Sequence, residues 1–293
     1  MKILLTGANG QVGWELARRG AHHGMEILAC DRLKLDITDE SAVRRAIKQA
    51  GASLAINAAA YTAVDKAEDN PELAYSVNEK GPANLAGACA EAGIPLIHIS
   101  TDYVFDGKKS GPYFETDPVS PLGIYGKSKR AGEEAVRRTF PIHIILRTAW
   151  LYGVHGYNFV KTMLHFGKEK KMLRVVDDQY GCPTYAADLA EAILIVGARV
   201  LNKQQVAWGT YHFCGKGVTT WYGFAKAVFD IARQYDSFLC TNIEPIPAAQ
   251  WPSPVKRPEN SVLDCTKITE AYGIHPKLWT ERLADMLKEY YRK

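Results

Sequence analysis

Short apolar segments alternate with helical patterns through the first half of the chain, and this alternation constrains the fold more than any other feature. The segments KILLTG, EILACD, LAINAAA, PLIHIS and IHIILRTAW have the composition of strands, and helical patterns lie between them. Such alternation is typical of a parallel sheet with helices on both faces, whose strands are apolar along their whole length. The sequence therefore predicts an α/β fold with a doubly wound parallel sheet.

The loop after the first of these strands is rich in glycine. TGANGQVG places Gly7, Gly10 and Gly13 between that strand and a helix, where a bound pyrophosphate needs a tight turn, a bare backbone and helix N–H groups. Asp31 ends the next strand, where a carboxylate can hold an adenosine ribose hydroxyl, whereas the guanidinium of Arg32 can accept a 2′-phosphate. The loop predicts a Rossmann-type dinucleotide site and leaves the choice between NADH and NADPH open.

The strand–helix rhythm loosens beyond about residue 150, where long polar connections and the proline-rich stretch 245–258 follow. This change indicates a smaller second lobe, and 293 residues are enough for two. We expect a dinucleotide-binding Rossmann domain at 1–149 and a mainly substrate-binding C-terminal lobe at 150–293. A strand near 173–179 is expected to return to the main sheet.

Charge and cysteine usage exclude several classes of protein. The net charge of +4 arises from 36 basic and 32 acidic residues spread along the chain, which does not suggest nucleic-acid binding. No apolar run approaches the roughly 20 residues of a membrane span, and the first is too short for a signal peptide. The six cysteines lack C-x-x-C and zinc-ligand spacing. We therefore expect a cytoplasmic protein with reduced thiols and neither a nucleic-acid nor a membrane partner.

A tyrosine and a lysine lie four residues apart in GIYGKSKRAGEEA, a segment of helical character. Tyr125 and Lys129 would share one helix face and could reach one ligand together. A neighbouring ammonium favours the phenolate and lowers the pKa of a tyrosine from about 10, which makes the phenol a better proton donor or acceptor. Because this spacing is also frequent in solvent-facing helices, the pair alone is compatible with a catalytic or a purely structural role.

Together, the glycine loop and the Tyr125–Lys129 pair resemble the extended branch of the short-chain dehydrogenase/reductase superfamily. The resemblance implies a third catalytic residue, Thr101, at the end of an earlier strand, with Ser100 as the alternative. One branch is closer, the dTDP-4-dehydrorhamnose reductases, which the chain resembles up to about residue 264 in the segments NAAAYTAVDKAE, STDYVFDG, PLGIYGKSKRAGE, RTAWLYG, NFVKTML, TTWYGFAK and RPENS. It implies NADPH- or NADH-dependent reduction of the 4-keto group of dTDP-4-dehydro-L-rhamnose to dTDP-L-rhamnose, a precursor of cell-surface polysaccharides.

The same resemblance implies roles for individual residues. Tyr125 would give a proton to the developing alkoxide, Lys129 would lower the tyrosine pKa and bind the nicotinamide ribose, and Thr101 would hydrogen-bond the same oxygen. Besides Gly7, Gly10, Gly13, Asp31 and Arg32, the expected cofactor contacts are Gln11, Val12, Asp36, Ile37, Ala60, Tyr61, Thr62, Tyr125 and Lys129.

The expected substrate contacts are Thr101, Asp102, Tyr103, Trp150 and Arg257. The arginine is a candidate bidentate clamp for the diphosphate. For Trp150, a role as a core aromatic between the lobes is equally compatible with the sequence. For Arg257, a position in a surface loop without ligand contact is equally compatible.

Some relatives are described as magnesium-dependent dimers with carboxylates at the interface. Glu15 and Glu289 match two of those positions, but Ala187 occupies the third, beside Asp188. A hard cation needs several oxygen ligands, so we expect at most a weak magnesium site, a solvated Glu15, and a monomer or homodimer.

Two other functions stay open. The first is another nucleotide-sugar reductase or an epimerase of the same superfamily; a dehydratase is disfavoured because Asp-Glu follows the threonine in dehydratases, whereas Asp102 and Tyr103 follow Thr101 here. The second is a non-catalytic role like that of the regulatory β subunit of methionine adenosyltransferase, which resembles these reductases and binds a partner protein. The presence of Thr101, Tyr125 and Lys129 favours catalysis.

Overall fold

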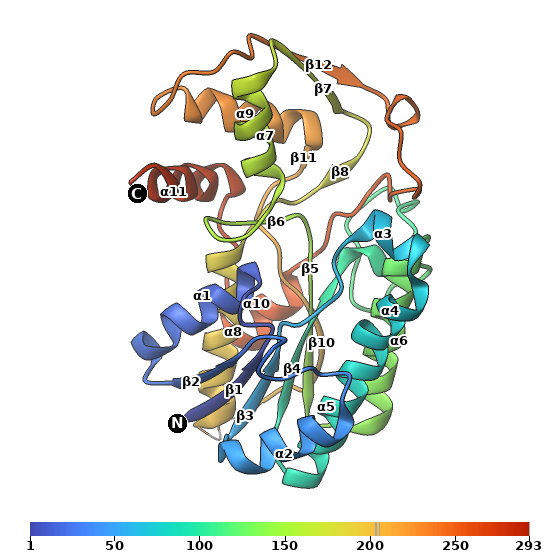
Figure 1. Cartoon of the computed structure of the whole chain (residues 1–293), viewed down its shortest axis with the longest axis vertical. Coiled ribbons are helices and arrows are strands. Elements are labelled where there is room, and N and C mark those ends of the chain that lie inside the picture. The colour runs from blue at the N-terminus through green and yellow to red at the C-terminus, as the bar shows by residue number, and fades with distance from the viewer. Residues whose placement is uncertain (203, 205, 293) are drawn as a thin grey trace.

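A parallel sheet forms the centre of the computed structural model, which describes residues 1–202, 204 and 206–292 (Figure 1). Within these residues six strands form the sheet in the order β10-β5-β4-β3-β1-β2, and all neighbouring pairs are parallel. The strands are β1 (Lys2–Thr6), β2 (Glu26–Cys30), β3 (Leu54–Asn57), β4 (Leu96–Thr101), β5 (His143–Thr148) and β10 (Gly209–His212). The predicted doubly wound α/β fold is confirmed.

Helices cover both faces of the sheet because alternate strand residues point to opposite faces. In β1, Ile3 and Leu5 enter one hydrophobic core, which includes Leu189, whereas Leu4 enters another, which includes Val43. The first face carries α1 (Gln11–Arg19), α8 (Ala186–Leu201) and α10 (Thr266–Tyr272), and the second carries α2 (Glu40–Ala50), α5 (Gly81–Ala92) and α6 (Ile124–Thr139). Before α5 the chain forms α3 (Val64–Asp69), α4 (Pro71–Tyr75) and a π-helical turn over residues 76–80.

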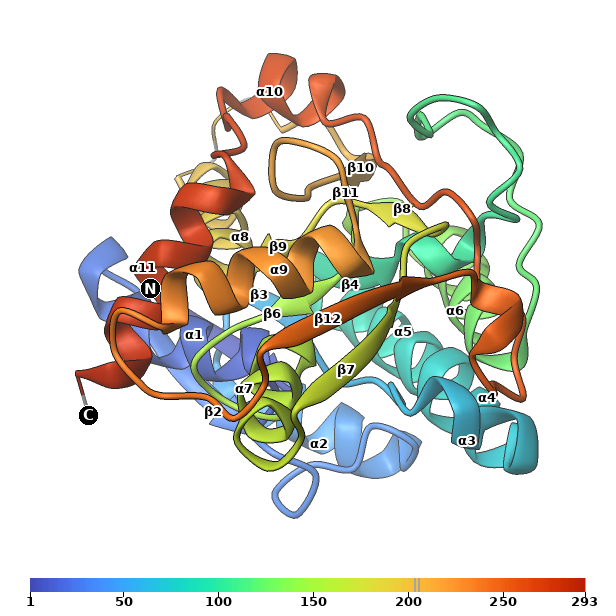
Figure 2. The same ribbon diagram turned by 90° about the horizontal axis from the view of Figure 1, so that it is seen from above.

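A second core lies beyond the carboxyl ends of the sheet strands, at the top of Figure 1. It is built by α7 (Phe159–Glu169), α9 (Trp221–Ala232) and α11 (Trp279–Tyr291), with β7 (Met172–Val176) and β12 (Asn242–Ile246) as a parallel pair. Figure 2 shows these two strands side by side beneath α9 in the chain's second lobe. Two further short pairs are present, namely β6 (Leu151–Tyr152) with β9 (Thr184–Tyr185) and β8 (Tyr180–Gly181) with β11 (Thr219–Thr220).

The strand predicted near 173–179 forms as β7, but its predicted return to the main sheet is wrong. It pairs with β12 because its apolar residues Leu173 and Val175 pack with Phe224 and Phe229 in the second core. The strand that returns to the central sheet is β10, which pairs with β5.

The C-terminal half contributes to both cores. β10 belongs to the sheet and α8 and α10 pack on it, whereas α7, α9 and α11 form the second core, so the chain crosses between the lobes repeatedly after residue 150. None of the helices within the described residues combines the length and apolar character that a bilayer crossing needs.

Candidate active site

The three residues expected to be catalytic lie together where β4 ends against α6. Thr101 is the last residue of β4 and is buried, while Tyr125 and Lys129 lie one turn apart on α6. Thr101 hydrogen-bonds the Tyr125 phenol, and Lys129 Nζ donates to the carbonyl of Ile99 at 2.7 Å. The ring of Tyr103 meets that of Tyr125 edge-on at a centroid distance of 5.5 Å. A phenol, an ammonium and a hydroxyl therefore meet at the carboxyl edge of the sheet.

Burial, and not the neighbouring ammonium, dominates the pKa of Tyr125. It raises this pKa to about 12, and the hydrogen bond with Thr101 offsets only part of the shift. Burial also lowers the pKa of Lys129 to about 8, although the carboxylate of Glu133 opposes the change. The expectation that Lys129 lowers the tyrosine pKa is therefore wrong. The phenol is neutral at pH 7 and carries the proton that a general acid needs.

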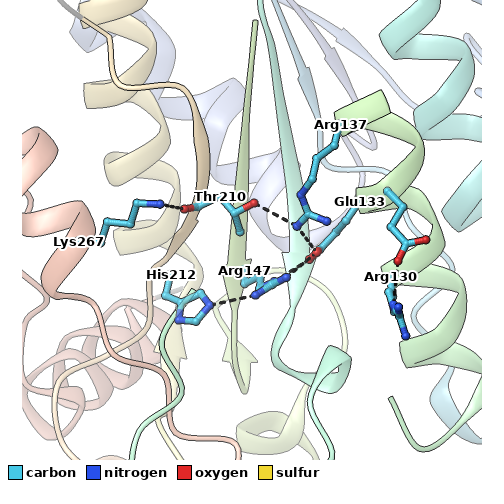
Figure 3. A network of polar contacts seen from close by, with 8 residues as sticks. Arg130, Glu133, Arg137, Arg147, Thr210, His212 and Lys267 are labelled. Carbon is cyan, nitrogen blue, oxygen red and sulfur yellow. Dashed lines mark hydrogen bonds and ion pairs between the residues drawn. The ribbon is translucent and has the colours of Figure 1, made fainter. Parts of the chain in front are cut away.

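Glu133, one turn after Lys129 on α6, fixes this helix to the sheet (Figure 3). It accepts hydrogen bonds from Arg147 in β5 at 2.8 and 2.7 Å and from Arg137 at 2.7 Å. Burial alone would raise the pKa of Glu133, but the hydrogen bonds and charge of the arginines bring it to about 2. The Ser100 hydroxyl is buried without a hydrogen-bond partner, and Thr101 is the hydroxyl beside the phenol.

The same network reaches β10 at the edge of the sheet (Figure 3). Arg137 Nη2 donates to Thr210 Oγ1 at 3.1 Å, and Arg147 Nη1 lies 3.4 Å from His212 Nε2. Burial, assisted by the charge of Arg147, lowers the pKa of His212 to about 3. The neutral imidazole can therefore accept from Arg147 while its Nδ1 faces the carbonyl of Tyr113 at 3.1 Å. The helix that carries Tyr125 and Lys129 is thus bound to two strands through buried polar groups.

A crevice of about 330 Å³ opens where β1, β2 and β3 end. The chain leaves β1 toward opposite sides of the sheet to form β2 and β3, and such a switch point is where doubly wound sheets bind nucleotides. Gly7 has φ +72°, and a Cβ on Gly13 would lie 2.1 Å from the Gly7 carbonyl oxygen. These close backbone approaches require glycine. The crevice is lined by Gly7, Asn9, Gly10, Asp31, Arg32, Leu33, Leu35, Asp36, Ile37, Ala58, Ala59, Ala60, Tyr61, Leu73 and Val77.

The acidic residue after β2 is held in a fixed position. Asp31 Oδ2 accepts from Asn9 Nδ2 at 3.1 Å and Oδ1 from the Lys34 backbone N–H at 3.0 Å, and the latter bond lowers the pKa of Asp31. Arg32 is largely exposed and approaches Asp36 at 3.6 Å. The crevice therefore offers both an oriented carboxylate and a guanidinium at its rim.

Three other expected cofactor residues have side chains outside this lining. Val12 is buried in the core beneath α1, and Thr62 is exposed. Gln11 Oε1 accepts a hydrogen bond from Asn158 Nδ2 at 3.0 Å, which connects the start of α1 to the start of α7.

Asn78 links the cofactor crevice to the catalytic helix. Its side chain accepts from the Tyr61 N–H at 2.8 Å and donates to the Tyr61 carbonyl at 3.0 Å. The same amide nitrogen donates to Ser128 Oγ on α6 at 3.0 Å. The loop after β3 and the helix that carries Tyr125 and Lys129 are thus held by one buried amide.

A larger cavity of about 710 Å³ lies in the second lobe. Its walls are mainly apolar and aromatic, with Lys170, Arg174 and Arg257 among the lining residues. The apolar and aromatic lining comes from Tyr157, Phe159, Met163, Phe166, Met172, Leu173, Val175, Val176, Trp221 and Trp251. Such a lining with a few cationic groups suits a ligand that has a flat ring and an anionic portion.

Trp150 packs against the wall of this cavity. Its ring stacks on that of Trp221 at 3.6 Å, and its Nε1 donates to Ser261 Oγ at 3.1 Å. It has a φ of 45°, a conformation that costs energy for a bulky residue and often occurs at functional sites. A Cβ on Gly181 would lie 2.3 Å from the Trp150 ring, so the glycine makes room for it.

Arg257 lines the large cavity and is already paired. One of its terminal nitrogens, Nη2, lies 3.1 Å from both carboxylate oxygens of Asp65, while Nε is buried without a partner. The arginine is therefore a fixed cation at the cavity wall and not a free surface residue.

Comparisons with known proteins identify the family. The family model described as RmlD substrate binding domain matches residues 1–292. A dTDP-4-dehydrorhamnose reductase from Aggregatibacter actinomycetemcomitans is 44% identical over 289 residues, which cover 97% of this chain and 98% of that protein. The chain belongs to the dTDP-4-dehydrorhamnose reductase family. The resemblance seen in the sequence is confirmed.

Solved structures of dTDP-4-dehydrorhamnose reductases have the same fold over almost the whole chain. The enzyme from Clostridium acetobutylicum gives a TM-score of 0.92 at 40% identity and covers 99% of both chains. The enzyme from Bacillus anthracis, solved in complex with NADP, gives a TM-score of 0.90 at 36% identity and covers 98% of this chain and 99% of that one.

The carboxylates considered for magnesium in this reductase-family chain are paired with arginines. Glu15 is 1% exposed, and its Oε2 accepts from Arg18 and Arg19 at 2.8 Å each, so the expectation of a solvated residue is wrong. Glu289 accepts from Arg18 and Tyr185 at 2.8 Å each. Within the described part of the chain no group of three or more potential ligands is arranged to hold a metal. The second oxygen of Glu15, Oε1, is buried without a hydrogen-bond partner.

Two residues that position the candidate active site, Glu133 and Asn78, were not predicted from the sequence. Glu133 follows Lys129 at helical spacing, and its partner Arg147 is the charged residue in the apolar segment IHIILRTAW. An arginine within a buried strand needs a partner, so that signal was present. Asn78 had no comparable signal, because its contacts join segments 17 and 50 residues apart.

Proposed function

We propose that this chain catalyses the NAD(P)H-dependent reduction of the 4-keto group of dTDP-4-dehydro-L-rhamnose to give dTDP-L-rhamnose. Membership of the dTDP-4-dehydrorhamnose reductase family supports the reaction. The observation that carries the proposal is the meeting of Thr101, Tyr125 and Lys129 at the end of β4, next to a glycine-lined crevice.

In this proposal Tyr125 is the proton donor. When bound, the reduced nicotinamide supplies a hydride to the sugar carbon. Tyr125, whose pKa of about 12 keeps it neutral, gives its proton to the oxygen as negative charge develops there. Thr101 donates a hydrogen bond to the same oxygen, and Lys129 adds positive charge beside it. The buried ion pair of Glu133 and Arg147 holds the helix in position for these contacts.

The crevice at the switch point is the proposed cofactor site. The bare backbone at Gly7, Gly10 and Gly13 suits a pyrophosphate at the start of α1, and the walls around Ile37 suit an adenine. Asp31 and Arg32 at the rim suit a ribose 2′-hydroxyl and a 2′-phosphate respectively.

The larger cavity is the proposed nucleotide site for the substrate. Trp221 and Phe166 offer flat surfaces for the base, and Arg257 offers a cation for the diphosphate. Asp102, Tyr103 and Trp150 are proposed to contact the sugar between this cavity and Tyr125. We further infer that residues 150–293 supply most substrate contacts, that the protein acts as a monomer or homodimer, and that it acts in the cytoplasm, for which its free cysteines are suited.

An activity assay with product identification tests the reaction. The upstream enzymes would generate dTDP-4-dehydro-L-rhamnose in situ, and oxidation of NADPH and NADH would be followed in separate reactions. Consumption of reduced cofactor with equimolar dTDP-L-rhamnose is expected. A folded protein that binds cofactor but consumes none with the substrate present would contradict the proposal and favour another keto-sugar nucleotide or a partner-binding role.

A further inference from the structure

Asp102 carries a buried carboxyl group that the proposed reaction does not yet use. It follows Thr101 at the end of β4 and is 2% exposed. Oδ1 accepts from the Thr101 hydroxyl at 2.9 Å, whereas Oδ2 is buried without a hydrogen-bond partner. The titratable groups that face it are Tyr103, Tyr125 and Cys182, none of them a cation. An ionised carboxylate in this position is therefore poorly compensated.

The surroundings of Asp102 allow its carboxyl group to exchange a proton near neutral pH. Burial raises the pKa of Asp102 to about 7, although the hydrogen bond from the Thr101 hydroxyl opposes the rise. A carboxyl group with such a pKa is present in both protonation states at neutral pH, so it can release and regain a proton during turnover.

A short path connects this carboxyl group to the proposed proton donor. The Thr101 side chain hydrogen-bonds both Asp102 and the Tyr125 phenol, and it therefore lies between them. A hydroxyl can accept one hydrogen bond and donate another at the same time. On the other side of the site, the Lys129 ammonium is engaged with the carbonyl of Ile99.

We propose that Asp102 is the proton reservoir that restores Tyr125 through Thr101. After Tyr125 gives its phenolic proton to the substrate oxygen, the phenolate takes the hydroxyl proton of Thr101. In the same step Thr101 takes the carboxyl proton of Asp102. The carboxylate that remains regains a proton from solvent before the next turnover. This inference rests on the proposed reduction.

The variant Asp102→Asn tests the reservoir because it keeps the size of the side chain and an oxygen acceptor but has no transferable proton. A loss of kcat of about tenfold or more at pH 7 is expected, with KM changed less than about twofold. In the wild type, kcat should fall as the pH rises through about 7, since only protonated Asp102 can give a proton; in the variant this dependence should be absent. Asp106→Asn, the same change at a carboxylate four positions further on, should keep both the rate and the pH profile.

A measurement without turnover separates this inference from the reaction itself. The infrared difference spectrum of wild type minus Asp102→Asn, recorded without cofactor from about pH 5 to about pH 9, should show a protonated carboxyl band that disappears near pH 7. If this band titrates as expected but the enzyme does not reduce the keto sugar, the proposed function is contradicted. The proposed acidity of Asp102 would still stand.

Two results would overturn the reservoir. One is an Asp102→Asn enzyme whose KM rises while kcat and its pH profile stay as in the wild type, because Asp102 would then be a sugar contact only. The other is a wild-type kcat that does not fall above about pH 7, which decides against the proposal even if the variant fails to fold.

Discussion

The cofactor crevice and the large cavity are built from different parts of the chain. The crevice is formed mainly by backbone and small residues directly after β1, β2 and β3, where close approaches such as that at Gly13 leave little freedom. The cavity is formed by large side chains from α7, β7, α9 and the region around Arg257, and it depends on stacking such as that of Trp150 on Trp221. A single added carbon atom should therefore largely abolish binding in the crevice, whereas loss of one side chain should only weaken binding in the large cavity.

Gly13→Ala should have the largest effect and should confine it to the crevice. Its Cβ would lie 2.1 Å from the Gly7 oxygen and 2.8 Å from Ala8 Cα, and these backbone atoms cannot move aside. We expect NADPH affinity to fall by about a hundredfold, or about 3 kcal/mol, with dTDP affinity unchanged, in fluorescence titrations. Gly87→Ala, where a Cβ meets nothing within 4 Å, is the control. Unchanged NADPH binding by Gly13→Ala would contradict the rigid crevice.

Glu133→Gln should destabilise the fold around the crevice and the catalytic helix. It leaves Arg147 as an unpaired buried cation, so we expect the free energy of unfolding to fall by about 3 kcal/mol in urea titrations. Glu134→Gln, a largely exposed neighbour, should change it by less than about 0.5 kcal/mol.

The pH dependence of stability provides a second test of this ion pair. The pKa of Glu133 is about 2 in the folded protein, below its ordinary value of 4.5. The stabilisation is therefore complete above about pH 4.5 and is lost as the pH falls toward about 2. Glu133→Gln should lack this part of the acid sensitivity, and equal acid sensitivity in both proteins would count against the pair.

Trp221→Ala should affect the large cavity and spare the crevice. The change removes one cavity wall and the stacking partner of Trp150. Calorimetry should show dTDP affinity reduced about tenfold, since an aromatic contact contributes about 1 kcal/mol beyond its buried area, with NADPH affinity retained. Trp208→Ala, at a partly exposed position outside the cavity lining, should leave both affinities unchanged. A loss of NADPH binding by Trp221→Ala would show that the two regions are not independent.

Arg257→Lys should have the smallest effect. A lysine keeps the charge but cannot bridge Asp65 and a diphosphate as a planar guanidinium does. We expect the KM of the sugar nucleotide to rise about threefold to tenfold, which is about 1 kcal/mol, with kcat retained. Lys256→Arg, at the exposed neighbouring position, is the matched control. An unchanged KM would show that Arg257 has a structural role and does not contact the diphosphate.

The two regions also differ in how far the sequence predicts them. The glycine loop, Asp31 and the strands of the main sheet were predicted because their signals are local: a turn, a strand end, an apolar run. Pairing of β7 with β12 was not predicted, because an apolar strand does not reveal which core its side chains will enter. The wall of the large cavity combines segments that no sequence period connects.

Burial explains the other errors. The spacing of Tyr125 and Lys129 predicted their proximity, but the pKa of the phenol depends on desolvation, which spacing does not report. Glu15 was expected to be solvated because it lies in a surface helix, yet it is buried and its Oε2 accepts hydrogen bonds from Arg18 and Arg19. The pKa of a side chain depends on its burial and charged neighbours in the packed structure, and these are the hardest features to predict from a sequence.

A single-turnover comparison of wild type with Tyr125→Phe tests the proposed proton donor directly. The crevice supplies most of the proposed cofactor contacts, whereas the Tyr125 phenol supplies the proton. Tyr125→Phe should therefore bind NADPH and dTDP as the wild type does, yet reduce the keto sugar at least about a hundredfold more slowly; Tyr235→Phe, at an exposed tyrosine, should be unaffected. Reduction by Tyr125→Phe at the wild-type rate would contradict the assignment of the proton donor.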